Sequence, residues 1–166
     1  MPIKKKKFIK YAQENMKRAF YSALGFVGDS DVAADLAQEA FIRAYSNFDS
    51  FDDSKKFFTW YYKILRNLSL NRIRDDERKG FLSLSENETD NSNAAVDFEA
   101  DEEKRNLELA LMKLEASDRE IIVLKEFENY SYEEIADLLD MPVGSVMSKL
   151  YYSRKKLSKI FLKIYE

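Results

Sequence analysis

The chain has 166 residues, enough for one ordinary domain or two small ones, and 45% of them are hydrophobic, as in globular proteins. It contains no cysteine and no histidine, which excludes disulfides, thiol chemistry and the usual zinc ligands. Histidine is the most frequent general base in enzymes, so we expect a binding protein that is not an enzyme and needs no cofactor or metal. No run of about 18 apolar residues occurs, and we expect a cytoplasmic chain without membrane insertion.

The formal net charge of −3 conceals a strong segregation of charge along the chain. Residues 54–79 and residues 141–166 each carry +5, whereas residues 80–103 carry −8 and contain no lysine or arginine. Such an acidic, polar stretch buries too little apolar surface to fold by itself, so it is interpreted as a flexible linker. The expected fold is therefore all-α, with two small helical domains, an N-terminal module (1–79) and a C-terminal module (104–166).

Two helices are predicted in the N-terminal module from the 3.6-residue period of apolar side chains. The first covers Asp31–Tyr45, with these residues on its apolar face: Leu36, Ala37, Ala40, Phe41 and Ala44. The second covers about Ser54–Arg74, with these residues facing the core: Phe57, Tyr61, Ile64, Leu65 and Leu68. The spacing places a polar stripe on the other side of this helix: Lys63, Asn67, Asn71 and Arg74.

Residues 57–62 hold five aromatic side chains in six positions, followed closely by basic and amide side chains. Unpaired bases stack on aromatic rings while cations follow the phosphates, so this composition favours binding of single-stranded DNA. A helix cannot expose every ring, and about half of them are expected to fill the core. Phe57 and Tyr61 are assigned to the core, and Trp60 and Tyr62 are left open.

The C-terminal module is predicted to be a helix-turn-helix domain. Two S-x-x-E patterns, at 117–120 and 131–134, indicate capped helix starts. A break at 140–144 then precedes a basic helix over about 143–165. The first residues of such a helix reach base edges in the major groove, and its basic residues meet phosphates.

Two other functions remain open from these residues alone. One is a dimeric helix-turn-helix regulator that binds duplex DNA without joining a polymerase. The other is a metal enzyme that relies on carboxylates, for which the acidic residues of 31–39 are a candidate site. Because no histidine is available to them, a docking surface for a basic partner is the preferred interpretation of that segment.

Three segments together resemble the bacterial RNA polymerase sigma factors of the sigma-70 family, in the extracytoplasmic-function group. They are DVAADLAQEAFIRAY (31–45), FFTWYYKILRNLSLNRIR (57–74) and LKEFENYSYEEIADLLDMPVGSVMSKL (124–150). The resemblance implies a specificity subunit that directs promoter-specific transcription initiation. The first two segments are similar to region 2, which docks on the polymerase and melts the promoter, and the third is similar to region 4.

The resemblance assigns three sets of site residues by position. The set that docks on the polymerase core is Asp35, Leu36, Gln38, Glu39, Phe41 and Arg43. The set that opens and reads the −10 element is Trp60, Tyr62, Lys63, Arg66, Asn67, Asn71 and Arg74. The set that reads the −35 element is Ser145, Met147, Ser148, Lys149, Tyr152 and Arg154.

The resemblance also implies partners and one departure from the family pattern. The partners are promoter DNA, duplex and single-stranded, the clamp helices of the largest polymerase subunit, the flap of the second-largest, and an anti-sigma factor. Met147 stands where the family usually has a basic residue, and Lys149 where it usually has arginine. Lysine cannot form the two-pronged contact that arginine makes with guanine, so the −35 element is expected to differ from the family norm.

Overall fold

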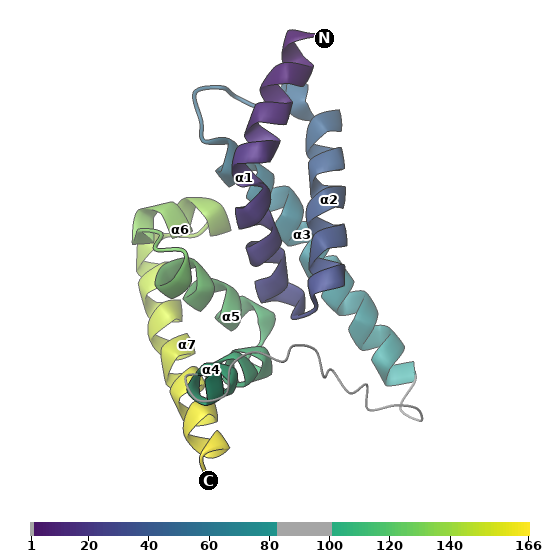
Figure 1. The fold of residues 1–166 in the computed structure, drawn as a ribbon. Coiled ribbons are helices and arrows are strands. Elements are labelled where there is room, and N and C mark those ends of the chain that lie inside the picture. Colours follow the sequence, from purple (N-terminus) through teal and green to yellow (C-terminus); the bar gives the residue numbers. More distant parts are fainter. Residues whose placement is uncertain (1, 83–100) are drawn as a thin grey trace.

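A computed structural model of the chain describes residues 2–82 and 101–166, and every regular element in these ranges is a helix. The N-terminal module contains α1 (Ile3–Val27), α2 (Ser30–Ser46), the 3₁₀ turn η1 (Phe48–Ser50) and α3 (Phe57–Leu82). The C-terminal module contains α4 (Asp101–Lys113), α5 (Ala116–Ile122), the π-helical turn η2 (Val123–Phe127), α6 (Tyr132–Leu139) and α7 (Val143–Ile164). Figure 1 shows the two groups of helices side by side, which confirms the predicted all-α fold of two helical groups.

The core of the N-terminal module is largely aromatic. Phe8 of α1 makes edge-to-face contacts with Phe48 and Phe57, and Tyr11 stacks on Phe57 with ring centroids 4.8 Å apart. Phe51 closes the cluster from the loop before α3. Such ring pairs contribute about 0.5–1.5 kcal/mol each beyond the area they bury, so the cluster fixes how the three helices pack.

Helix α1, like α4, was not among the helices predicted from the sequence. It buries Phe8, Ala19, Ala23 and Phe26 against α2 and α3, at intervals that fit one face of a helix. It ends at Gly28, which has a left-handed φ of 70° and donates its backbone N–H to the carbonyl of Leu24 at 2.8 Å. Glycine adopts this conformation without a steric penalty, which makes a sharp turn into α2 possible.

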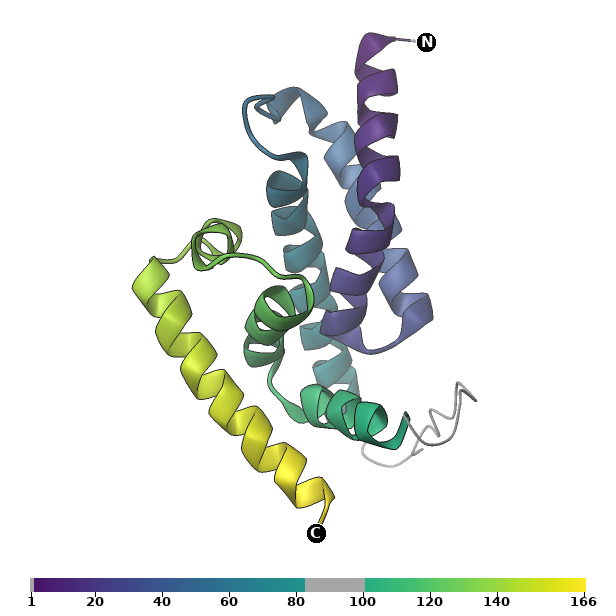
Figure 2. The same ribbon diagram turned by 60° about the vertical axis from the view of Figure 1, so that its left-hand side comes forward.

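The helix-turn-helix prediction is confirmed in the C-terminal module. Ser131 accepts a hydrogen bond from the backbone of Glu134, whose side chain accepts one from the backbone of Ser131, so the predicted capping box is present. Asp140, with a φ of 53°, ends α6, and α7 begins at Val143. Figure 2 shows α7 along the outer edge of the molecule, with α4 against its C-terminal part.

Three predicted boundaries are wrong. The acidic linker was expected over 80–103, but α3 continues to Leu82 and α4 begins at Asp101, so helices take up both ends of that range, while residues 83–100 lie outside the described residues. The helix expected from Ser54 begins at Phe57, because Ser54 donates two hydrogen bonds to Asp52 in a turn. The capping box expected at Ser117 is absent, since α5 already begins at Ala116.

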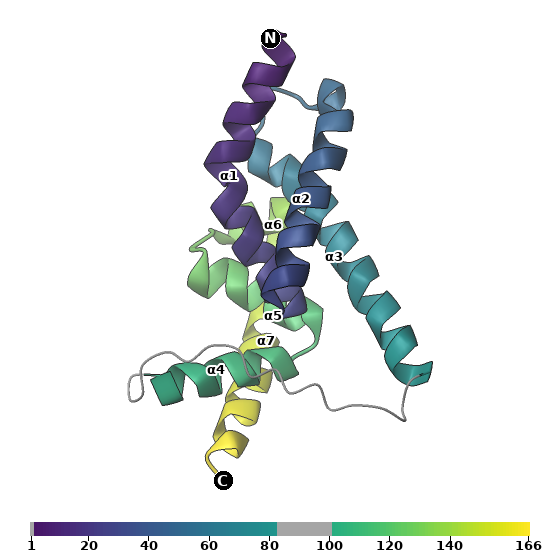
Figure 3. The same ribbon diagram turned by 45° about the vertical axis from the view of Figure 1, so that its right-hand side comes forward.

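The two modules contact each other directly. Helix α5 packs against α1, and α6 packs against α3. Figures 1 and 3 both show α5 and α6 next to the α1–α3 group, while the C-terminal end of α3 projects away from it. This contact decides which of the predicted site residues are exposed.

Candidate nucleic-acid interface

The polar stripe of α3 lies on the surface, as its spacing predicts. Lys63, Asn67, Asn71 and Arg74 are all exposed, and Leu65 is buried on the opposite side of the helix. Within residues 2–82 and 101–166, no ion pair involves any of the four. The stripe therefore presents two cations and two amides to an incoming ligand.

The aromatic run before the stripe is more buried than expected. Phe57, Phe58, Tyr61 and Tyr62 all belong to the core, whereas about half of the rings were expected there. Trp60 is partly buried against Phe48 and Phe51 and is the one ring of the five that keeps appreciable exposure. Trp60 is thus the best placed of the five to stack on an unpaired base.

Tyr62 and Arg66, both expected to contact DNA, are bound instead by a carboxylate of the other module. The Tyr62 hydroxyl and the Arg66 Nε–H each donate a hydrogen bond of 2.8 Å to Glu120 Oε1. Tyr62 is only 1% exposed, and the Glu120 side chain only 2%. The sequence indicated no such contact, because Glu120 was interpreted as part of a capping box.

Burial shifts the pKa values of Glu120 and Tyr62. Desolvation raises the pKa of Glu120, and the nearby Arg66 guanidinium and the two hydrogen bonds lower it again only in part. Desolvation, together with the Glu120 charge, also holds the pKa of Tyr62 well above its ordinary value. Tyr62 therefore stays protonated near neutral pH and remains a hydrogen-bond donor to Glu120.

The predicted polymerase-docking residues of α2 are divided between surface and core. Four of them are exposed, namely Asp35, Gln38, Glu39 and Arg43. Phe41 is partly buried and stacks on Tyr61 at 4.3 Å between centroids, and Leu36 is a core residue at 6% exposure. Leu36 therefore packs inside the module and offers little surface to a partner.

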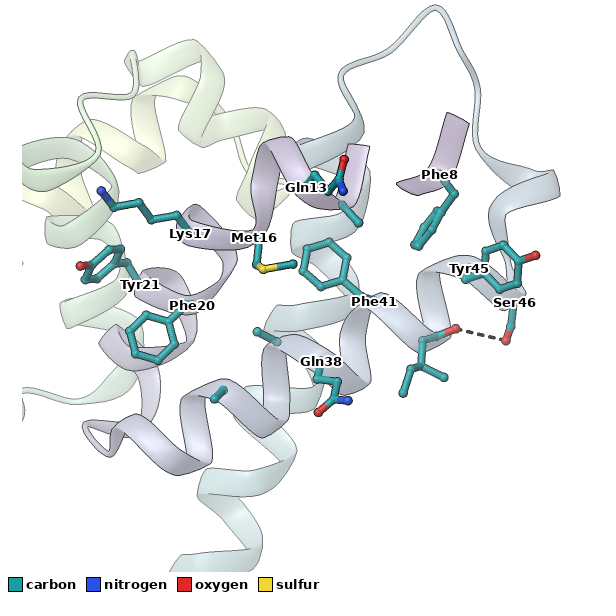
Figure 4. A pocket seen from close by; sticks show the side chains of 14 residues that line it. Phe8, Gln13, Met16, Lys17, Phe20, Tyr21, Gln38, Phe41, Tyr45 and Ser46 are labelled. Atoms are coloured by element: carbon teal, nitrogen blue, oxygen red, sulfur yellow. Dashed lines mark hydrogen bonds between the residues drawn. The ribbon is translucent and has the colours of Figure 1, made fainter. Parts of the chain in front are cut away.

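An apolar groove of about 1050 Å³ lies between α1 and α2 (Figure 4). On the α2 side Gln38, Phe41 and Ile42 line it, and on the α1 side Met16 and Phe20 do. Met16 and Ile42 are 57% and 60% exposed, which is high for large apolar side chains. The sequence analysis made no structural prediction for residues 1–28 and therefore missed the α1 side of the groove. The four-residue spacing of Met16 and Phe20 is the signal that places both on one face of a helix.

Helix α7 presents most of its predicted DNA contacts to solvent. Four of the six are exposed and make no side-chain hydrogen bond within the described ranges: Ser145, Met147, Ser148 and Tyr152. Lys149 is partly buried and donates to Ser117 Oγ at 3.3 Å, and Arg154 is paired with Glu126. Ser145, Ser148 and Tyr152, three and four residues apart, lie on one side of the helix, and Met147 lies on another exposed side.

A buried carboxylate fixes this helix to the rest of the module. Asp118 of α5 accepts hydrogen bonds from Ser153 Oγ at 2.7 Å and from Lys156 Nζ at 2.8 Å. Burial acts to raise the pKa of Asp118, but these hydrogen bonds and the Lys156 charge outweigh it, and the net shift is downward. Asp118 therefore stays ionised and holds α7 in a fixed orientation on α5.

Residues 2–82 and 101–166 include no group of three or more acidic side chains placed to hold a metal ion. The same ranges contain no helix that is both long and apolar enough to cross a membrane. What the exposed stripes of α3 and α7 offer is hydrogen bonding, charge and stacking, which are the interactions that nucleic-acid recognition uses.

Comparisons with known proteins identify the family of the chain. Residues 11–79 match Sigma-70 region 2, and residues 104–157 match Sigma-70 region 4. The chain is 35% identical over 144 residues to the ECF RNA polymerase sigma factor SigW of Bacillus subtilis, covering 80% of the chain and 77% of the relative. It is 33% identical over 143 residues to the ECF RNA polymerase sigma-E factor of Escherichia coli K12, covering 80% and 74%.

Solved structures share the fold as well. The sigma factor RpoE of Bartonella quintana, in complex with the anti-sigma factor NepR, superposes with a TM-score of 0.73 at 24% identity, covering 97% of this chain and 99% of that one. CnrH, in complex with the cytosolic domain of CnrY, gives a TM-score of 0.66 at 22% identity, covering 94% and 88%. The chain therefore belongs to the sigma-70 family of RNA polymerase sigma factors, in the extracytoplasmic-function group, whose members are not enzymes and direct promoter-specific transcription initiation.

Proposed function

We propose that the two modules divide promoter recognition between them. The N-terminal module (1–79) binds the −10 element as an opened strand, and the C-terminal module (104–166) reads the −35 element as duplex. The observation that carries this proposal is the presence of two separate exposed polar faces, one on α3 and one on α7. The α3 face has side chains suited to single-stranded DNA, and the α7 face has side chains suited to duplex DNA.

The α3 face suits a single strand. The amides of Asn67 and Asn71 offer a paired donor and acceptor to base edges, and Lys63 and Arg74 supply charge for phosphates. Trp60, the partly exposed ring, adds stacking worth about 1–3 kcal/mol per base. Together these contacts supply the free energy that holds a melted strand open.

The α7 face suits the major groove of duplex DNA. Ser145, Met147 and Ser148 lie in its first two turns, where a recognition helix meets base edges. Met147 is apolar where a cation is usual in the family, and it favours contact with a thymine methyl group over an acceptor of guanine. The −35 element of this sigma factor therefore differs from the family norm.

The α1–α2 groove is the proposed docking site for the polymerase core. An apolar groove between two helices accepts the apolar face of a partner helix, and the clamp helices of the largest polymerase subunit are such a partner. Asp35, exposed on α2 beside the groove residue Ala34, adds charge for basic side chains of that partner, and Glu39 is paired with Arg43 on the same helix. The C-terminal module then docks on the flap of the second-largest subunit.

We further propose that an anti-sigma factor regulates this chain. The support is that two solved structures with this fold were determined as complexes with such partners, NepR and the cytosolic domain of CnrY. Since polymerase and promoters are cytoplasmic, the protein acts there.

Altered specificity tests the division of labour. Met147→Arg is expected to change base preference only in the upstream element, and Asn67→Ala only in the downstream one, in transcription from a randomised promoter library with polymerase core. Each substitution is at an exposed position, so folding should be retained. A change of both elements by either variant would refute the assignment of one element to each module.

A further inference from the structure

The beginning of helix α1 carries more positive charge than its fold requires. Residues 4–7 are four lysines in succession, and Lys10 is a fifth within the first three turns. The first turn contains no acidic residue, and Pro2 at the N-cap supplies no side-chain hydrogen bond to it. Because the helix dipole already places positive charge at this end, lysines in the first turn are unfavourable for the helix. The stability of α1 therefore does not explain the cluster.

Two of the five lysines are paired with the loop that precedes α3. Lys4 donates to Asp49 Oδ2 at 2.8 Å, and Lys7 forms an ion pair with Asp53. The hydrogen bond with Asp53 raises the pKa of Lys7, so this amine stays charged. These two pairs attach the beginning of α1 to the loop and cancel the charge of two of its carboxylates.

The other three, Lys5, Lys6 and Lys10, form a free lysine cluster. All three side chains are exposed, and within residues 2–82 and 101–166 none of them forms an ion pair. Lys6 and Lys10 are four residues apart, a spacing at which like charges on a helix repel each other. The match to Sigma-70 region 2 begins at residue 11, so the family pattern does not account for the cluster.

The free lysine cluster lies close to the start of the proposed strand-binding face of α3. Phe8, which lies between the lysines in the sequence, contacts Phe48, and Phe48 in turn contacts Trp60, with ring centroids 5.3 and 6.4 Å apart. Two ring contacts therefore connect the beginning of α1 to the ring proposed to stack on an unpaired base. Figures 1 and 3 show the beginning of α1 at the end of the module opposite to the C-terminal end of α3. The polar stripe thus runs from Trp60 in one direction, and the cluster lies in the other.

The loop between Trp60 and the cluster, residues 47–56, does not repel a polyanion strongly. Two of its three carboxylates, Asp49 and Asp53, are neutralised by lysines of α1. The third, Asp52, accepts two hydrogen bonds from Ser54 and lies in the field of the exposed Lys55. A bound strand can therefore continue across this loop from the α3 face to the cluster.

We propose that Lys5, Lys6 and Lys10 bind phosphates of the unpaired promoter strand where it extends beyond Trp60. The inference rests on the proposed function of α3 and lengthens its binding site. Lysine suits this task, because its ammonium group contacts a phosphate as a point charge and reads no bases. The cluster adds affinity for the opened strand and leaves base preference to the α3 face.

An anionic membrane surface also attracts lysines, but the surroundings of the cluster favour DNA. A helix that lies on a membrane buries a continuous apolar face among the lipids. Among residues 2–10, Phe8 is buried in the protein core, and Ile3 is the only large apolar side chain that is mostly exposed. One such side chain offers little apolar area to lipid, whereas a nucleic-acid strand needs only the charge.

The salt dependence of strand binding tests the proposal. Lys5→Gln combined with Lys6→Gln removes two charges of the cluster, and Lys104→Gln combined with Lys113→Gln removes two charges from exposed positions of α4 as the matched control. The probe is a fluorescent random-sequence single strand of about 16 nucleotides, or of about four. Its binding to the chain in complex with polymerase core is followed by anisotropy over a range of salt concentrations, with core alone as the background.

The longer strand should distinguish the two variants. Each phosphate contact on a single strand contributes about 0.7 to the slope of log affinity against log salt concentration, so the loss of Lys5 and Lys6 should reduce this slope by about 1.4. Affinity at low salt should fall by about fivefold or more. The α4 variant should behave like the natural chain, and the short strand, which occupies the α3 face alone, should bind all three proteins equally.

The outcomes separate this inference from the proposed function. An unchanged slope for the Lys5→Gln, Lys6→Gln variant, with strand binding intact, would overturn the inference and leave the proposed function of α3 standing. A natural chain that adds no strand affinity to the polymerase core would overturn both. Vesicles that contain an anionic phospholipid are the second probe. If the variant loses vesicle binding but keeps the slope of the natural chain, the cluster binds a membrane surface and the inference is wrong.

Discussion

At the residue scale, Asp118 decides how firmly α7 is held. Asp118→Asn keeps an acceptor for Ser153 but loses the ion pair with Lys156, and we expect the free energy of unfolding to fall by about 1–2 kcal/mol. Glu126→Gln, which breaks an exposed pair, should cost less than about 1 kcal/mol. Chemical denaturation of the three proteins checks this.

The stability difference between the natural protein and Asp118→Asn is also expected to depend on pH. The folded pKa of Asp118 lies below the 3.8 of an ordinary aspartate, so its ionised form stabilises the fold at every pH above that value. The advantage over Asp118→Asn should therefore be constant near neutrality and disappear as the pH falls through the lowered pKa. If the natural protein became more stable relative to Asp118→Asn as the pH falls, the ion pair between Asp118 and Lys156 would be contradicted.

Asn67 separates function from stability. Because its side chain is exposed, Asn67→Ala should change the free energy of unfolding by less than about 0.5 kcal/mol. Loss of one base-reading amide should nevertheless lower initiation roughly tenfold on a promoter that the natural protein uses. Glu77→Ala, exposed on the same helix, is the control and should leave initiation unchanged.

Residue periodicity predicted the exposed stripe of α3, because spacing alone fixes which side of a helix a residue takes. It did not predict that Glu120 would bind Tyr62, a contact that spans 58 positions. Local pattern carries no information on such a pairing, and the S-x-x-E spacing at Ser117 pointed to a local role instead. Tyr62 is buried by this contact and by the rings of Phe26 and Phe58 in its own module.

At the scale of elements, α7 combines a packing face with a binding face. Leu150 is buried and Met147 is exposed, within one turn of each other. Leu150→Ala should lower the free energy of unfolding by about 2–5 kcal/mol, whereas Met147→Ala should leave it nearly unchanged and weaken binding of −35 duplex. Thermal unfolding and electrophoretic mobility shift measurements distinguish the two, and a duplex affinity insensitive to Met147→Ala would remove it from the proposed interface.

Elements with clear start and stop signals were predicted closely, and the others were not. Helix α2 and helix α7 agree with prediction to within one residue at each end, and the capping box of α6 is present. The ends of the acidic segment were misplaced because Gly80 and the acidic residues 101–103 have the composition of a linker but lie within helices. Tertiary packing overrides propensity at such positions.

At the scale of the whole molecule, family membership decides against both alternatives that composition left open, a polymerase-independent regulator and a metal enzyme. The sequence predicted the two helical modules, since the acidic segment divides the chain visibly. It did not predict their contact, which depends on dispersed residues such as Arg18 and Arg119.

The α1–α2 groove predicts how the molecule joins the polymerase. Met16→Glu places a charge on its apolar wall and should weaken binding to the core by roughly fivefold or more, without affecting binding of −35 duplex. Ile3→Glu is the control, since Ile3 is also an exposed apolar residue of α1 but does not line the groove. Equal core affinities of the two variants would place the docking surface elsewhere.

Run-off transcription from a random promoter library, with polymerase core in the presence and absence of this protein, is the most direct test of the central claim. Two modules that read two elements should select templates with two short conserved motifs at a fixed spacing, and only when the protein is present. Selected templates with a single motif, or no transcripts that depend on the protein, would contradict it.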